Sequence, residues 1–172
     1  DADPVVVDDV IFVATYNGDL AAVDLASGSV LWRRTLSAHE GLAADGGMLY
    51  VTDSDDVLWA ASPADGAGTW KQEGLRYRRV TAPAVIDELL VVGDVDGYVH
   101  WLDRRDGRIV ARLEVGDGRI STRPLAEGGR VYVLGDDGTL AALSPGSAPP
   151  RRPLPPPTPD APSEAAAESP GR

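Results

Sequence analysis

Ala22-Val-Asp24-Leu-Ala-Ser-Gly28-Ser-Val-Leu-Trp32 is the stretch of sequence that decides the fold, because its pattern returns further along the chain. A second copy lies 38 residues later and keeps Gly66 and Trp70, and a third copy lies 79 residues after the first and keeps Asp103 and Gly107. A fixed period of about 40 residues is typical of proteins that are built from tandem supersecondary units. The sequence therefore predicts a repeat protein.

The repeat runs through most of the chain. A shift of 79 positions superposes further identical residues without a gap: Pro4 on Pro83, Val6 on Val85, Asp8 on Asp87 and Gly18 on Gly97. A fourth copy begins 41 residues after the third and places Pro124 and Gly138 on Pro83 and Gly97. We therefore expect repeats at about 4–41, 42–82 and 83–123 and a partial repeat at 124–143.

Each repeat contains short apolar and β-branched runs that are separated by turn residues. Val10-Ile-Phe-Val-Ala is followed by Asn17-Gly18 and then by Asp19-Leu-Ala-Ala-Val-Asp24. Such runs predict strands, and Asn-Gly or Asp-Gly pairs suit tight hairpins because glycine tolerates positive φ. Several runs are apolar at consecutive positions, as at 89–92, so both faces of each sheet need cover. We expect an all-β fold, a β-propeller fragment of about four blades.

The last 29 residues differ in composition from the repeats. They hold 10 of the 14 prolines, and their three arginines balance three acidic residues. We expect 144–172 to be a disordered proline-rich tail, because it cannot bury enough apolar surface to offset its ordering entropy. The whole net charge of −11 then falls on 1–143. An acidic domain without a basic cluster argues against a nucleic-acid partner.

Cysteine and membrane signals are missing from the sequence as given. The absence of cysteine excludes disulfides, thiolate metal sites and a cysteine nucleophile. No apolar run approaches the roughly 18 residues of a membrane-spanning helix. The chain begins Asp1-Ala-Asp3-Pro4, without Met and without a signal peptide, so we expect that its true start lies further upstream.

The 22–32 stretch resembles the Ala-x-Asp-x-x-x-Gly-x-x-x-Trp signature of pyrroloquinoline-quinone-like propeller repeats. Two copies diverge from it, with Ser62 in place of Asp and Ala111 in place of Trp. We expect each Trp to be an apolar anchor between neighbouring blades, with its indole N–H seeking one acceptor. The predicted structural anchors are Asp24, Gly28, Trp32, Gly66, Trp70, Asp103 and Gly107.

A closer resemblance is to the BamB family of outer-membrane lipoproteins, which serve the β-barrel assembly machinery. The most discriminating stretch is Val92-Gly-Asp-Val-Asp-Gly-Tyr-Val-His-Trp-Leu-Asp103, and 16–28, 41–42 and 50–55 add to it. The resemblance implies the C-terminal half of an eight-bladed protein whose lipidated N-terminal cysteine is absent from this chain. It also implies a non-catalytic scaffold without a cofactor, at the periplasmic face of the outer membrane.

The family resemblance also implies partners and one candidate binding site. In the family, an Asp-x-Asp pair before the opening Pro contacts a POTRA domain of BamA, the barrel subunit. Alignment on Pro4 without a gap matches Asp1 to the second acid of that pair, whereas a two-residue deletion would make Asp1 and Asp3 the pair. Other barrel-assembly components and nascent outer-membrane proteins are the further implied partners.

Other candidate sites are weaker. Three acidic groups, 53–56, 94–96 and 136–137, recur at the hairpin register and lack the EF-hand pattern, so we interpret them as turns and predict no metal site. Neither His39 nor His100 has a triad or zinc partner at motif spacing, and a half-buried strand position is the expectation for His100. Two alternative functions stay open, a quinoprotein dehydrogenase and a propeller ligand sensor. The lack of the vicinal cysteine pair of such dehydrogenases speaks against the first.

Overall fold

The computed structural model describes residues 3–15, 18–38, 40–45 and 47–147. Its regular structure consists of fifteen strands and one short 3-10 turn, η1 (Pro145–Ser147). The described part of the chain contains no helix of the length and apolarity that a bilayer crossing requires. Residues 148–172, which hold most of the predicted tail, lie outside the described residues.

The strands form four antiparallel sheets in sequence order. The first sheet consists of β1 (Val5–Val7), β2 (Val10–Ala14), β3 (Asp19–Asp24) and β4 (Val30–Thr35). The second consists of β5 (Leu42–Asp45), β6 (Met48–Thr52), β7 (Leu58–Ala61) and β8 (Gly68–Gln72). The third consists of β9 (Ala84–Ile86), β10 (Leu89–Gly93), β11 (Tyr98–Asp103) and β12 (Ile109–Glu114). The fourth has three described strands, β13 (Leu125–Glu127), β14 (Arg130–Leu134) and β15 (Leu140–Leu143).

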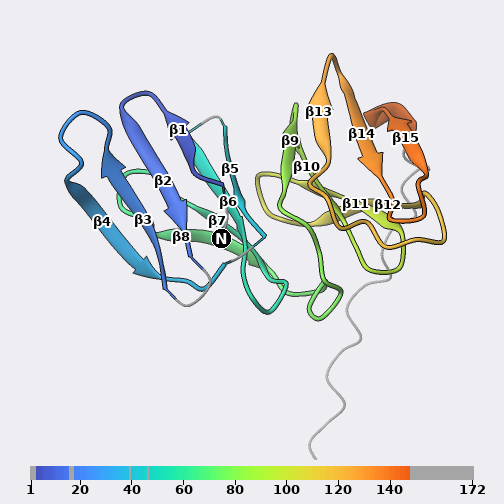
Figure 1. Cartoon of the computed structure of the whole chain (residues 1–172), viewed down its shortest axis with the longest axis horizontal. Helices are drawn as coiled ribbons and strands as arrows, with labels where there is room; N and C mark the ends of the chain where they lie inside the picture. The colour runs from blue at the N-terminus through green and yellow to red at the C-terminus, as the bar shows by residue number, and fades with distance from the viewer. Residues whose placement is uncertain (1–2, 16–17, 39, 46, 148–172) are drawn as a thin grey trace, which may run out of the picture.

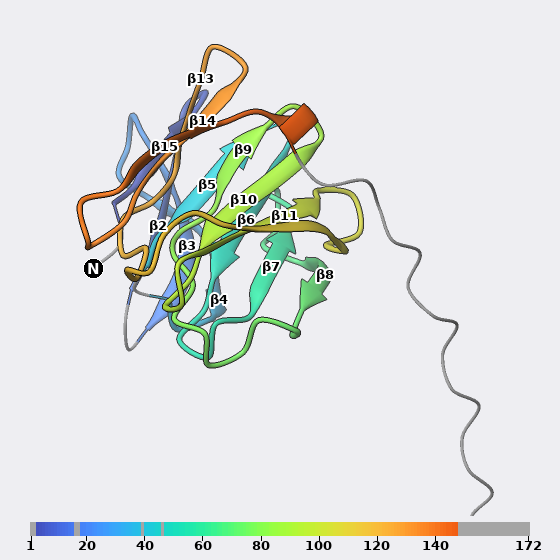
Figure 2. The same cartoon turned by 90° about the vertical axis from the view of Figure 1, so that its right-hand side faces the viewer.

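The sheets are arranged as consecutive blades. Each is a meander in which every strand pairs with its sequence neighbour, and the first strands, β1, β5, β9 and β13, contact one another along the inner side (Figure 1). In the view at right angles, β13 to β15 of the fourth blade lie above β10 and β11 of the third (Figure 2). This arrangement confirms the predicted all-β fold and β-propeller architecture.

Each pair of adjacent blades shares a hydrophobic core. In β10, the side chains of Leu90 and Val92 pack with the second blade, whereas Val91 packs with the fourth, and all three are fully buried. Alternate strand residues point to opposite faces, so a strand between two blades must be apolar at every position. Full burial of one such side chain contributes about 1.5–3 kcal/mol to folding, which explains the consecutive apolar run at 89–92.

The loops that join successive blades lie at one end of the propeller, here called the connecting end. They comprise 36–41, 73–83 and 115–124, and each is tied to the second hairpin of the following blade. The amides of Ser54, Val95 and Asp136 donate to the carbonyls of Ser37, Arg78 and Arg119, at 2.8, 2.9 and 2.7 Å. The same loop-to-hairpin hydrogen bond therefore recurs in three successive blades.

Candidate functional site

The two tryptophans of the repeat lie between neighbouring blades. The indole N–H of Trp32 donates to Pro63 O at 2.8 Å, and that of Trp70 donates to Arg104 O at 3.0 Å. Both side chains are half-buried. Each ring packs against a glycine of the next blade, Gly66 or Gly107, whose φ angles are +70° and +71°. These contacts interlock blades one, two and three.

The two predicted aspartates of the repeat organise turns at the opposite end from the connecting loops. Asp24 Oδ1 accepts from the Ser27 amide at 2.7 Å and from the Ser27 hydroxyl, and these bonds hold the Asp24 pKa below its usual value. The guanidinium of Arg105 binds Asp103 at 2.7 Å and lowers the Asp103 pKa to about 2. Gly28 has a similar positive φ, +72°, but a Cβ added there would meet no atom within 4 Å.

The acidic N-terminal candidate is only partly described, because Asp1 lies outside the described residues. Asp3 is exposed and directly precedes the first blade. Burial lowers the pKa of Arg123, and the negative charge of Asp3 opposes this shift. Arg123 Nη1 also donates to Leu42 O at 3.4 Å. The acid therefore has an electrostatic partner within its own chain.

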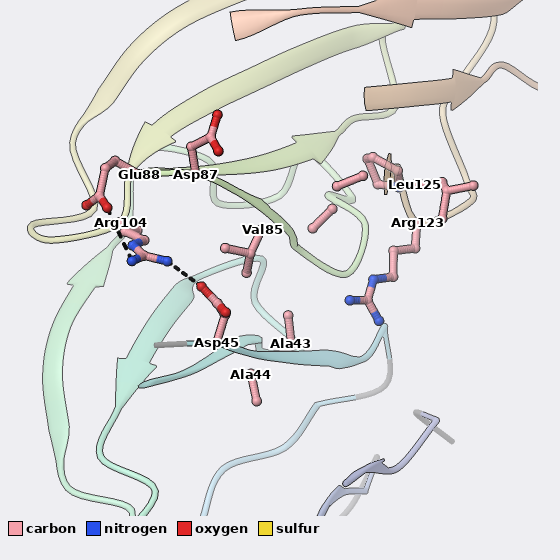
Figure 3. Close-up of a pocket in the computed structure, with 12 residues that line it drawn as sticks. Ala43, Ala44, Asp45, Val85, Asp87, Glu88, Arg104, Arg123 and Leu125 are labelled. Atoms are coloured by element: carbon pink, nitrogen blue, oxygen red, sulfur yellow. Dashed lines mark hydrogen bonds and ion pairs between the residues drawn. The ribbon is translucent and has the colours of Figure 1, made fainter. Parts of the chain in front are cut away.

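The inner side of the blades holds a cavity of about 730 Å³ (Figure 3). Its walls come mainly from the first strands of blades two, three and four. Arg104 forms ion pairs with Asp45 and Glu88, and Arg123 lies on the other side of the cavity (Figure 3). The described residues include no group of three His, Cys, Asp or Glu side chains that could hold a metal ion.

The acidic hairpin residues form turns, as predicted. Asp53 Oδ1 accepts from the amides of Asp55 and Val57, both at 2.9 Å. Asp137 Oδ1 likewise accepts from the Thr139 amide at 2.9 Å. Each carboxylate thus satisfies backbone donors of its own hairpin, which is the usual role of Asp in such turns.

Sequence reasoning missed a pair of a carboxylate and a ring N–H or nitrogen that recurs in two blades, buried in the third blade and partly buried in the second. Asp94 Oδ2 lies 2.7 Å from His100 Nε2, and Asp53 Oδ2 accepts from Trp59 Nε1 at 2.7 Å. The expectation that His100 would be half-buried is wrong, because its residue is only 2% exposed. The signal available in the sequence was a side chain with a ring nitrogen six residues after a hairpin aspartate. Because this side chain is Trp in one repeat and His in the next, a search for identical residues between repeats does not find it. His39 lies outside the described residues.

Asp94 is a fully buried carboxylate that is bound by several neighbours. Burial by itself would raise its pKa, but the hydrogen bond with His100, the Tyr98 amide and the Arg78 guanidinium together lower the pKa to about 2. Arg78 lies within 2.7 Å of Asp94 and also reaches Asp96 at 2.9 Å. Asp94 therefore joins a blade hairpin to loop 73–83.

Comparison with known proteins gives one consistent result. The family model described as outer membrane protein assembly factor BamB matches residues 1–72 and 73–148. Proteins of that name from Escherichia coli K12 and Alkalilimnicola ehrlichii are 38% and 41% identical over 84% and 83% of this chain. The chain spans 37% of the length of each of these curated relatives.

A solved structure agrees with these sequence matches. The crystal structure of BamB from Moraxella catarrhalis superposes with a TM-score of 0.78 and 29% identity, over 84% of this chain and 43% of that one. The family match covers both pairs of repeats, and the blades superpose on a solved member. The chain therefore belongs to the family of the outer membrane protein assembly factor BamB.

Proposed function

We propose that this chain is part of a non-catalytic scaffold that assists the assembly of β-barrel proteins at the periplasmic face of the outer membrane. The observation that carries the proposal is the match of the family model to both halves of the repeat region. Two relatives that are 38% and 41% identical to this chain over the aligned residues are named as outer membrane protein assembly factors. The mechanism is docking, with the blades as a rigid frame for exposed loops.

The proposed partner is a POTRA domain of BamA, bound through the acidic segment before the first blade. Asp1 is the leading contact residue, and Asp3 is the second acid if the pair is shifted. Support comes from the exposure of Asp3 and from the net charge of −11, because complementary charge accelerates encounter with a basic surface and fixes its register. Other assembly components and nascent outer-membrane proteins are proposed as further partners.

The chemistry of the described residues also favours a scaffold over an enzyme. Asp94 and Asp103, whose pKa values are both lowered to about 2, are bound by side chains of their own blades and loops. The alternative of a quinoprotein dehydrogenase lacks its vicinal cysteine pair, since the sequence as given has no cysteine. A role as a ligand sensor would require occupancy of the inner cavity.

Binding to purified BamA POTRA domains tests the proposal. We expect Asp1→Arg and Asp3→Arg to weaken binding and to flatten its dependence on salt, because screening acts on the same charge pairs. Asp9→Arg is the matched control, since Asp9 is exposed in the β1–β2 turn at the opposite end of the same sheet. Equal affinity for all variants at both low and high salt would refute docking through the acidic segment.

A further inference from the structure

Tyr77 is the most exposed large apolar residue of the described chain, with 77% of its surface accessible. It lies in loop 73–83 at the connecting end, in a left-handed conformation with φ of +63°, and Arg79 follows with φ of +50°. Left-handed backbone is unfavourable for residues other than glycine and persists only where the surroundings impose it.

Buried side chains and one carboxylate fix the loop on both sides of Tyr77. Leu75 and Val80 are 2% and 0% exposed. Asp56, in the hairpin of the preceding blade, accepts from the Arg79 amide at 2.9 Å and from the Val80 amide at 3.0 Å. Arg78, which lies between Tyr77 and Arg79 in the sequence, forms an ion pair with Asp94. Tyr77 is therefore an exposed aromatic side chain on a pre-organised backbone, which lowers the entropy lost on contact.

Arg119 supplies an unpaired cation next to this loop. Arg119 occupies the same position in its repeat as Arg78, because it follows Arg78 by the repeat offset of 41 residues. The carbonyl of each accepts a backbone amide from the second hairpin of the following blade. The carboxylate that binds Arg78 is Asp94, but its counterpart in the fourth blade is Gly135. Arg119 Nε is accordingly buried without a hydrogen-bond partner, and no acid within the described residues forms an ion pair with Arg119.

These features meet at one cavity of about 470 Å³. Its lining residues are Glu40, Ser54, Asp56, Tyr77, Arg79 and Arg119. Both oxygens of Asp56 accept backbone amides, and Glu40 has an interaction of its own. Within the residues that the structure describes, the guanidinium groups of Arg79 and Arg119 form no ion pair, so they can donate to a ligand.

We propose that this cavity docks an acidic polypeptide segment, with a carboxylate bound by Arg119 and Arg79 and an apolar side chain packed on Tyr77. Arginine presents paired donors that match a carboxylate, and exposed aromatic residues are frequent binding hot spots. An anionic lipid surface or a nucleic acid is disfavoured, because the net charge of −11 repels an extended polyanion. The site includes neither Asp1 nor Asp3 and would bind an acidic ligand, whereas the acidic segment would bind a basic one, so it is separate from the proposed POTRA contact.

The test measures binding of the full chain to a short fluorescein-labelled peptide in which glutamate alternates with phenylalanine. We expect Arg119→Ala and Tyr77→Ala each to weaken binding about tenfold, the loss that follows from one charge-assisted bond or one aromatic contact. Arg119→Lys should restore part of the affinity. Arg130→Ala is the matched control, since Arg130 is exposed at the β13–β14 turn of the opposite end.

The outcomes separate a specific site from general attraction. Loss in the Arg119 and Tyr77 variants with the Arg130 variant unchanged supports the site, as does loss of binding when the peptide's glutamates become glutamines. Equal losses in all arginine variants would overturn the proposal. So would binding to phosphatidylglycerol vesicles in place of the peptide. Because no POTRA domain is present, failure here leaves the proposed BamA contact unaffected.

Discussion

Trp32 lies directly against Gly66 of the following blade, so that a Cβ on Gly66 would come within 2.7 Å of Trp32 Cζ3. The same relationship joins Trp70 to Gly107 in the next pair of blades. Each indole N–H also donates to a carbonyl of the turn that bears the glycine. Each Trp ring therefore packs closely against the next blade at a position where only glycine leaves enough room.

Gly66→Ala should destabilise the chain more than Gly28→Ala. Both glycines have φ near +70°, so both substitutions carry a strain of about 1 kcal/mol. Only Gly66 also faces a ring, and we expect this overpacking to cost a further 1–3 kcal/mol or so. Urea unfolding followed by tryptophan fluorescence measures the difference. Equal destabilisation of both variants would show that the ring moves away without cost.

Trp70 should contribute through its ring more than through its hydrogen bond. Trp70→Ala removes a large aromatic contact between blades two and three, and we expect a loss of about 3 kcal/mol, the lower end of the range for such truncations because the ring is half-buried. Trp70→Phe keeps most of the apolar contact and leaves Arg104 O without its donor, at a cost of about 1 kcal/mol. Thermal unfolding of both variants checks the order, and a larger loss for Phe than for Ala would contradict it.

The repeat made the fold predictable from sequence, because strand-forming apolar runs and turn glycines recur at about 40 residues, which is the period of a four-stranded blade. The placement of a large ring against glycine follows from the same pattern. The pairing of Asp94 with His100 was not predictable in this way. In blade two, Trp59 takes the place of the histidine as the partner of the hairpin aspartate. In blade four, neither the aspartate nor the ring is kept. What recurs in blades two and three is a hydrogen bond and not a residue type. The unpaired state of Arg119 depends likewise on Gly135, a distant position that carries no motif.

Asp94 should make the stability of the chain depend on acid pH. Folding lowers the Asp94 pKa from 3.8 to about 2, so the ionised carboxylate favours the folded state above about pH 4 and this contribution is lost as the pH falls towards 2. A shift of this size corresponds to about 2 kcal/mol. We expect Asp94→Asn to be less stable near neutral pH and to lose less stability between about pH 4 and 2.

Urea unfolding at a series of pH values measures this effect. The difference near neutral pH gives the constant cost of the substitution, and only the change of that difference in acid reports the titration of Asp94. Parallel pH profiles for the two proteins would mean that Asp94 is not the titrating group.

The exposed apolar surfaces of the first and fourth blades should cause the chain to self-associate. Eight of the nine exposed large apolar residues in the described ranges belong to these two blades: Val6, Val7, Leu25, Val30, Leu31, Leu125, Leu134 and Leu140. In the described part of the chain, β15 pairs only with β14, and an open strand edge beside apolar side chains is a site for association. We therefore expect sedimentation that depends on protein concentration.

Charged substitutions on these surfaces test whether they are the contact. Leu31→Lys with Leu140→Lys places one charge on each outer blade, at residues that are 54% and 71% exposed, so folding should be little affected. The double variant should sediment as a monomer at concentrations where the parent associates, because a lysine ammonium is costly to bury without a partner. Tyr77→Lys, which adds the same charge at the connecting end, is the control and should associate like the parent. A parent chain that remains monomeric at every concentration would instead show that the exposed surfaces stay apart in solution.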